Sequence, residues 1–239
     1  MKKWLISSAI SALALTSAAS ADIKIAHVYG KTGPFEAYAK QSHDGLMLGL
    51  EYATGGTMEI NGEKIVVIEK DTQLKPDNGK ALLEEAYGDD EVDLAVGPVS
   101  SGVALAMLPV AEEYEKLLIV EPAVADSITG ANYNRYIFRT GRNSSQDAVA
   151  NAIALAGEDV HIATLAQDYA FGRDGIAAFR EALEGQGQGI AHEEYVPTDT
   201  TDCTAAAERI FTAMKDLEGD KKLFIIWAGG GNPMGKIQA

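Results

Sequence analysis

Short apolar runs alternate with segments of helical spacing along the chain from residue 23 onward. Six of these runs have strand character, and they begin at Ile23, Lys64, Val92, Lys116, Val160 and Lys222. The runs are apolar almost throughout, which is typical of parallel strands covered on both faces. Repeated alternation of such strands with helices predicts a doubly wound α/β fold.

Apolar stripes mark two of the helices expected between these strands. They consist of Ala39, Leu46, Leu50 and Ala53 in the first helix and of Ala207, Ile210, Phe211, Met214 and Leu217 in the second. Each stripe predicts which side of its helix packs on a sheet. Thr201 or Asp202 is expected to cap the second helix, because a short polar side chain accepts hydrogen bonds from first-turn N–H groups.

The alternation divides into two series near "NRYIFRTGRNSSQDA", residues 134–148. We therefore expect two Rossmann-like lobes, the first over residues 22–139 and the second over residues 140–239. The second series holds only two complete strand–helix units, too few to close a core. We expect the second lobe to be truncated and the chain to be a fragment.

The first 21 residues have the pattern of a signal peptide. Lys2 and Lys3 precede an apolar stretch over residues 4–15, which is too short to span a bilayer. Small residues at Ala19 and Ala21 suit signal peptidase, so cleavage is expected after Ala21. A membrane anchor is the alternative. The pattern predicts an exported, periplasmic protein.

Composition narrows the classes of partner. The formal net charge is −15, and an acidic chain is repelled by phosphate backbones, so no nucleic-acid partner is expected. The four histidines lack metal-ligand spacing, and neither a G-x-S-x-G elbow nor a P-loop is present. We expect no metal, no cofactor and no enzymatic activity. Cys203, the single cysteine, stands at a helix start and leaves no internal disulfide possible.

A Ser-Ser-Gly corner follows the third strand in "GPVSSGVALAML", residues 97–108. Ligands of open α/β sheets bind at the carboxyl ends of strands, where helix N-termini point outward. A helix start offers unpaired N–H groups to an anion, and Ser100 and Ser101 add hydroxyl donors beside Gly102. The alternative is that Ser100 only caps the helix.

Aromatic residues lie near several other strand ends. Tyr38, Tyr169, Phe171 and Trp227 could wall an apolar pocket, although each could equally pack in a core. Their common position at strand ends favours a cleft.

These corners resemble the leucine/isoleucine/valine-binding protein family, the periplasmic receptors of branched-chain amino-acid ABC importers with the type I periplasmic-binding fold. The resemblance is carried by "DIKIAHVYGKTGPFEAYAKQSHDGLMLGLEYAT", "AVGPVSSGVALAMLPVAEEYEKLLIVEPA", "YIFRT" and "DYAFGRDGIAAF". It extends from Asp22 to the end of the chain and implies a two-lobed clamp.

The resemblance also implies roles for residues. Ser101 would donate to the ligand carboxylate, aided by N–H groups near Ser100 and Gly102. The backbone at Ala123 would hold the α-ammonium and carboxylate groups. At Ala125 the family commonly carries a threonine, so a ligand without an α-amino group is an alternative. The remaining implied contacts are Tyr38, Tyr169, Phe171 and Gly230 of the Gly229–Gly231 turn.

The resemblance implies a monomeric, non-enzymatic solute receptor that delivers a small carboxylate-bearing molecule, foremost a branched-chain amino acid, to a membrane permease. Three alternatives stay open: a receptor for an aromatic or other organic acid, a ligand sensor of the same fold, and a secreted α/β enzyme.

Overall fold

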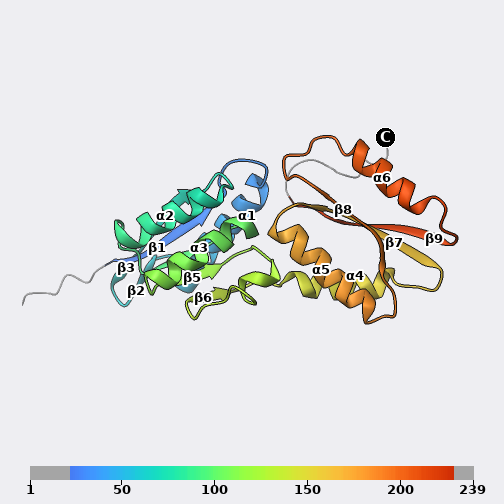
Figure 1. Ribbon diagram of the computed structural model, residues 1–239. Helices are drawn as coiled ribbons and strands as arrows, with labels where there is room; N and C mark the ends of the chain where they lie inside the picture. The colour runs from blue at the N-terminus through green and yellow to red at the C-terminus, as the bar shows by residue number, and fades with distance from the viewer. Residues whose placement is uncertain (1–21, 229–239) are drawn as a thin grey trace, which may run out of the picture.

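Two separate sheets organise the computed structural model, which describes residues 22–228 (Figure 1). The larger sheet has the strand order β2-β3-β1-β4-β5-β6. Its strands are β1 (Ile23–Tyr29), β2 (Glu59–Ile60), β3 (Glu63–Asp71), β4 (Leu94–Val96), β5 (Leu117–Val120) and β6 (Ile137–Arg139). Every pairing in this sheet is parallel except that of β2 with β3. The predicted α/β fold with parallel sheets is confirmed.

Helices cover both faces of the larger sheet, as strands without a polar face require. The helical elements are α1 (Glu36–Ala53), α2 (Pro76–Gly88), α3 (Ser101–Glu113) and the short 3₁₀ helix η1 (Asp126–Ile128). Ala26 and Val28 of β1 pack with α2 and α3, whereas Ile25, the residue before them, packs with α1 on the other face. This alternation of one strand between two layers explains its continuous apolar run.

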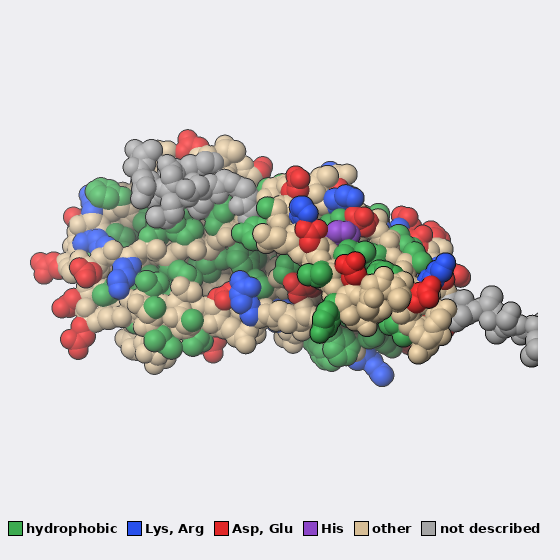
Figure 2. All heavy atoms as spheres, turned by 180° about the vertical axis from the view of Figure 1, so that it is seen from behind, with side chains coloured by type: hydrophobic (Ala, Val, Ile, Leu, Met, Phe, Trp, Pro, Cys, Tyr) green, Lys and Arg blue, Asp and Glu red, His purple; other side chains and the backbone are tan. Residues whose placement is uncertain are grey.

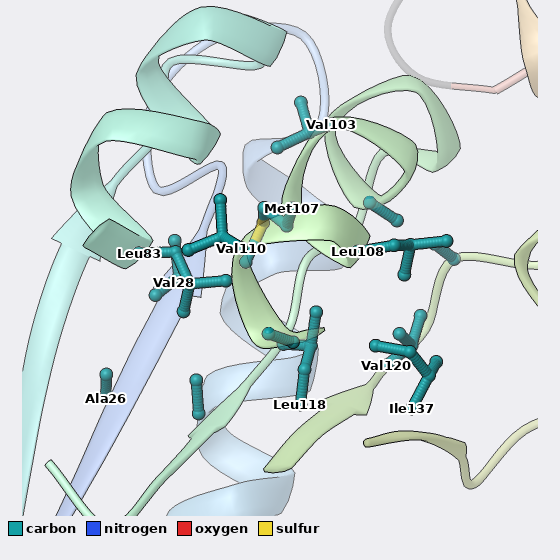
Figure 3. Packing of buried hydrophobic residues seen from close by; sticks show 14 of the residues in the cluster. Ala26, Val28, Leu83, Val103, Met107, Leu108, Val110, Leu118, Val120 and Ile137 are labelled. Atoms are coloured by element: carbon teal, nitrogen blue, oxygen red, sulfur yellow. The ribbon is translucent and has the colours of Figure 1, made fainter. Parts of the chain in front are cut away.

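The core of the first lobe is built around α3 (Figure 3). Met107 and Val110 of α3 lie with Leu83 of α2 above Val28, and Leu108 faces Val120 and Ile137 (Figure 3). Because α3 carries apolar side chains on most of its surface, it is buried deeply. That burial holds the N-terminus of α3, with the Ser-Ser-Gly corner, at the end of the sheet where β4 stops.

The smaller sheet has the order β8-β7-β9, and its pairings are parallel. Its elements are α4 (Ser144–Leu155), β7 (Val160–Gln167), α5 (Ala170–Glu184), β8 (Ile190–Val196), α6 (Thr204–Met214) and β9 (Asp220–Ile226). Ile162 of β7 packs with α4 and α5, while Ala163 and Leu165 pack with α6. The chain crosses from the larger sheet to this one after β6.

We propose two domains, residues 22–139 and residues 140–239. The predicted signal peptide lies outside the described residues.

Several hydrogen bonds connect the lobes beside this crossing, among them those that Ser145 donates to Asp126. The backbone N–H of Ser127, in η1, donates to Asp174 Oδ2 of α5 over 2.9 Å. The backbone N–H of Ser144, at the start of α4, donates to the Val124 carbonyl over 2.8 Å. These bonds tie the second lobe to the loop that follows β5.

The apolar pattern did not predict β2, β6 and β8 as strands. β8 carries His192, Glu193 and Glu194 at its centre, which conceals its strand character. The structure pairs Glu193 with Arg180 and Glu194 with Arg209, each over 2.6 Å, so these charges are satisfied at a sheet edge. Charged side chains of this kind also suit an edge strand.

The second helical stripe is partly wrong. Ile210 and Met214 are buried, but Phe211 is 68% exposed. The N-cap of α6 is Cys203 instead of Thr201 or Asp202, although Asp202 Oδ1 accepts from the Thr204 N–H over 2.9 Å.

Charges are scattered over the surface. On the face shown in Figure 2, acidic side chains are interspersed with basic ones over both lobes. None of the helices within residues 22–228 is long and apolar enough to cross a membrane.

Candidate ligand-binding cleft

A cavity of about 190 Å³, here called the central cleft, lies between the two lobes. The first lobe contributes the starts of α1 and α3 and the loop after β5, and the second contributes the segments at the starts of α4 and α5 and at the end of β9. The lining residues are Phe35, Tyr38, Val99, Ser101, Pro122, Val124, Arg142, Tyr169, Phe171, Trp227 and Ala228.

Gly97 makes the corner beneath this cleft possible. Its φ is +120°, and a Cβ there would lie 2.1 Å from the Val28 carbonyl oxygen. Only glycine combines that conformation with so close an approach. The corner therefore brings the chain from β4 across the end of β1 and directly into α3.

Ser101, the first residue of α3, has its hydroxyl in the cleft wall. It is 2% exposed, and its Oγ accepts the Ala125 N–H over 3.2 Å. A hydroxyl that accepts one bond still has its own proton to donate. Ser101 can thus present an O–H to a ligand oxygen beside the positive end of the helix.

Ser100 stands at the N-cap position of α3 without making a side-chain capping bond. The capping alternative therefore lacks the hydrogen bond on which it depends. Next to it, a Cβ at Gly102 would lie 3.7 Å from Tyr169 Cδ2, an ordinary van der Waals distance, so the Tyr169 ring of the second lobe lies beside the helix start.

Ala123 and Ala125 lie behind the lining, which Pro122 and Val124 form at this place. The Ala123 N–H donates to the Pro98 carbonyl over 3.3 Å, and the Ala125 carbonyl accepts from Arg139 Nη1 over 2.8 Å. Burial lowers the pKa of the Arg139 guanidinium from its ordinary value, against the opposing effect of Asp126. A direct ligand contact at Ala123 or Ala125 stays a prediction.

Aromatic rings form much of the wall. Phe35 and Tyr38 meet edge to face with centroids 6.5 Å apart, and Tyr169 and Phe171 are tilted with centroids 5.9 Å apart. The structure brings the predicted residues Tyr38, Tyr169 and Phe171 together with Ser101. Burial raises the pKa of Tyr169 well above its ordinary value, so its phenol stays neutral. Gly230 lies outside the described residues.

Trp227 contributes a polar group to the same wall. Its indole Nε1 is buried without a hydrogen-bond partner within the described part of the chain. A buried donor of this kind costs free energy until an acceptor reaches it, so it is a second candidate contact for a ligand oxygen.

Arg142 is the charged side chain that the described residues place in the cleft lining. Its Nε contacts both carboxylate oxygens of Asp147 at 2.8 Å, which directs the guanidinium while its terminal nitrogens stay available. Sequence reasoning missed Arg142 and Phe35, since a single arginine or phenylalanine in a loop belongs to no pattern. Within residues 22–228, no group of three or more His, Cys, Asp or Glu side chains is arranged to hold a metal ion.

A family model described as periplasmic binding protein matches residues 22–226. The chain belongs to the periplasmic binding protein family. Its relatives include the Leu/Ile/Val-binding protein BraC3 of Rhizobium johnstonii, which is 27% identical over 240 residues, covering 99% of this chain and 62% of that protein. The family assignment confirms the resemblance noted in the sequence.

Two solved structures of this family are informative. An ABC-type branched-chain amino acid transporter from Rhodopseudomonas palustris CGA009 is 66% identical, with a TM-score of 0.69 over 91% of this chain and 58% of that one. An ABC transporter solute-binding protein from Rhodopseudomonas palustris BisB5, in complex with 3,4-dihydroxy benzoic acid, is 30% identical, with a TM-score of 0.74 over 87% and 54%. The chain thus spans a little over half the length of these structures.

Proposed function

We propose that this periplasmic binding protein is the solute receptor of an ABC importer and holds a small carboxylate between its lobes. The observation that carries the proposal is the meeting of three donors at one cleft: the Ser101 hydroxyl, the start of α3 and the Arg142 guanidinium. Hydrogen bonds from such donors to an ionised carboxylate are stronger than hydrogen bonds between two neutral groups. The aromatic wall suits an apolar body attached to that carboxylate.

The two lobes give the receptor its mechanism. Ser101 belongs to the first lobe and Arg142 to the segment that enters the second, so a ligand held by both favours the closed arrangement. A ligand can shift an open–closed equilibrium only by its difference in affinity for the two states. The closed receptor then docks on a membrane permease in the periplasm and releases its solute.

Two ligand classes fit this cleft. A branched-chain amino acid is the first, in keeping with the names of the relatives. An aromatic carboxylate is the second, because no acidic side chain among the described residues lines the central cleft to pair with an α-ammonium. The 30% identical relative in complex with a dihydroxybenzoic acid supports this second class.

Calorimetry on the full-length protein tests the proposal, using leucine, isoleucine, valine, phenylalanine, benzoate and 3,4-dihydroxybenzoate. We expect at least one of these to bind, and Arg142→Met to weaken it at least tenfold. Arg135→Met is the matched control, since Arg135 lies over the Tyr136 ring away from the cleft. Absence of binding by all six, or equal effects of the two variants, would overturn the proposal.

A further inference from the structure

A second hollow of about 520 Å³, here called the outer hollow, adjoins the central cleft. The two share Phe35, Tyr169 and Ala228 in their linings, so they are separated only by side chains at the lobe boundary. The segment over residues 73–76 and the start of α3 form its first-lobe side. Ser100 and Lys75 line the outer hollow but do not line the central cleft.

Ser100 supplies a buried hydroxyl to this hollow. The residue is 7% exposed and lines the hollow, and its side chain has no hydrogen-bond partner within the described residues. Its Oγ lies 3.9 Å from the position that a Cβ on Gly102 would occupy, over the first turn of α3. A largely buried hydroxyl that makes no bond within the protein is free to donate to a molecule in the hollow.

Two helices begin at the same hollow. Lys75 is the N-cap of α2 and Ser100 the N-cap of α3, and neither side chain makes a capping bond. The first-turn N–H groups of both helices therefore add positive potential on this side.

Lys75 adds a full positive charge. Its ammonium contacts Gln73 Oε1 at 3.4 Å and makes no ion pair within the described part of the molecule. Asp199 lines the opposite, second-lobe side and is exposed. Gln167 beside it is already bonded, since its Oε1 accepts the Ala228 N–H over 2.9 Å. The donors gathered around Ser100 thus outnumber the single acidic group across the hollow.

We propose that the outer hollow is a second carboxylate subsite, so that the two cavities together take an elongated dicarboxylate. One carboxylate lies at Ser101 and Arg142, the chain passes Phe35 and Tyr169, and the other carboxylate meets Ser100 and Lys75. The proposal rests on the proposed function for its first carboxylate. It assigns to Ser100 a role distinct from that of its neighbour.

A length series tests this inference by calorimetry on the full-length protein. The probes are α,ω-dicarboxylates from succinate to azelate, each compared with the monocarboxylate of the same chain length. We expect an optimum length at which the dicarboxylate binds at least tenfold more tightly than its monocarboxylate. Two carboxylate seats at a fixed separation require such an optimum.

Variants assign the effect to the hollow. Ser100→Ala and Lys75→Met should each remove most of the dicarboxylate advantage and leave monocarboxylate affinity within twofold. Asp199→Asn should strengthen dicarboxylate binding, because a repelling charge is lost. Lys80→Met, on the same helix as Lys75, is the control for charge alone, since Lys80 makes only a 3.8 Å pair with Glu84.

The outcomes separate the two proposals. Dicarboxylates that bind no better than monocarboxylates, or variants that weaken both series equally, would overturn the outer subsite and leave the receptor function standing. If neither the dicarboxylates nor the monocarboxylates bind, the outer subsite is overturned as well. The receptor function is tested separately, by the amino acids and benzoates named above.

Discussion

Ala125 donates its backbone N–H to the Ser101 hydroxyl over 3.2 Å, joining the loop after β5 to the first turn of α3. Two adjacent strand ends are thereby fastened at the floor of the central cleft. The bond also orients the hydroxyl, because an oxygen that accepts from one side directs its own proton elsewhere.

Replacing Ser101 with alanine should weaken ligand binding by about 1–3 kcal/mol, the scale of a hydrogen bond to a charged group. Calorimetry with the best ligand of the screen measures the change. Gly45→Ala serves as a control, since a Cβ there meets nothing within 4 Å. Unchanged affinity in Ser101→Ala would reduce the residue to a structural contact between two loops.

His27 should make stability depend on pH. Its ring is fully buried, stacks on Tyr29 at 3.9 Å and has its Nδ1 3.1 Å from that of His43. Burial and the neighbouring His43 lower the pKa of His27 from 6.5 to about 4, against a smaller opposing effect of Glu69.

The unfolded chain therefore binds a proton near pH 6.5, whereas the folded chain resists it until about pH 4. Stability is full above pH 6.5 and falls by up to about 3 kcal/mol between the two values. Urea denaturation from pH 7 to pH 4 measures the decline. His27→Phe should flatten it, whereas His161→Gln, at a half-buried site in β7, should not; equal curves for all three proteins would contradict the assignment.

Gly97 and Gly49 should respond in opposite directions to alanine. At Gly97 the positive φ and the 2.1 Å approach to Val28 oxygen make Gly97→Ala destabilising by about 3 kcal/mol or more. Gly49 lies inside α1, where a Cβ meets nothing within 4 Å, so Gly49→Ala should stabilise by about 0.5–1 kcal/mol. Thermal unfolding of both variants tests the pair, and a tolerated Gly97→Ala would show that the corner can reshape.

Cys203 should be unreactive in the folded protein. It is 1% exposed at the N-cap of α6. A helix start favours the reactive thiolate form, but burial keeps a thiol reagent from reaching the sulfur. Labelling with a disulfide reagent should be slow in buffer and rapid in denaturant, and Cys203→Ser should leave ligand affinity unchanged. Rapid labelling of the native protein would refute this.

Much of the fold could be predicted because buried parallel strands have a distinctive apolar pattern, as β1 and β7 illustrate. β8 was missed because its edge position allows Glu193 and Glu194 to pair with arginines from neighbouring helices. Ser101 could be placed at the site because it follows a strand and opens a helix. Arg142 could not, since only the crossing between lobes brings its loop to the cleft.

Trp227 gives the cleft a built-in optical reporter. The sequence contains two tryptophans, and the other, Trp4, belongs to the segment expected to be cleaved during export. Of these two, Trp227 would remain after processing, and it lines the central cleft. Occupancy by a solute should change the wavelength and intensity of that emission, so binding can be followed without attaching a dye.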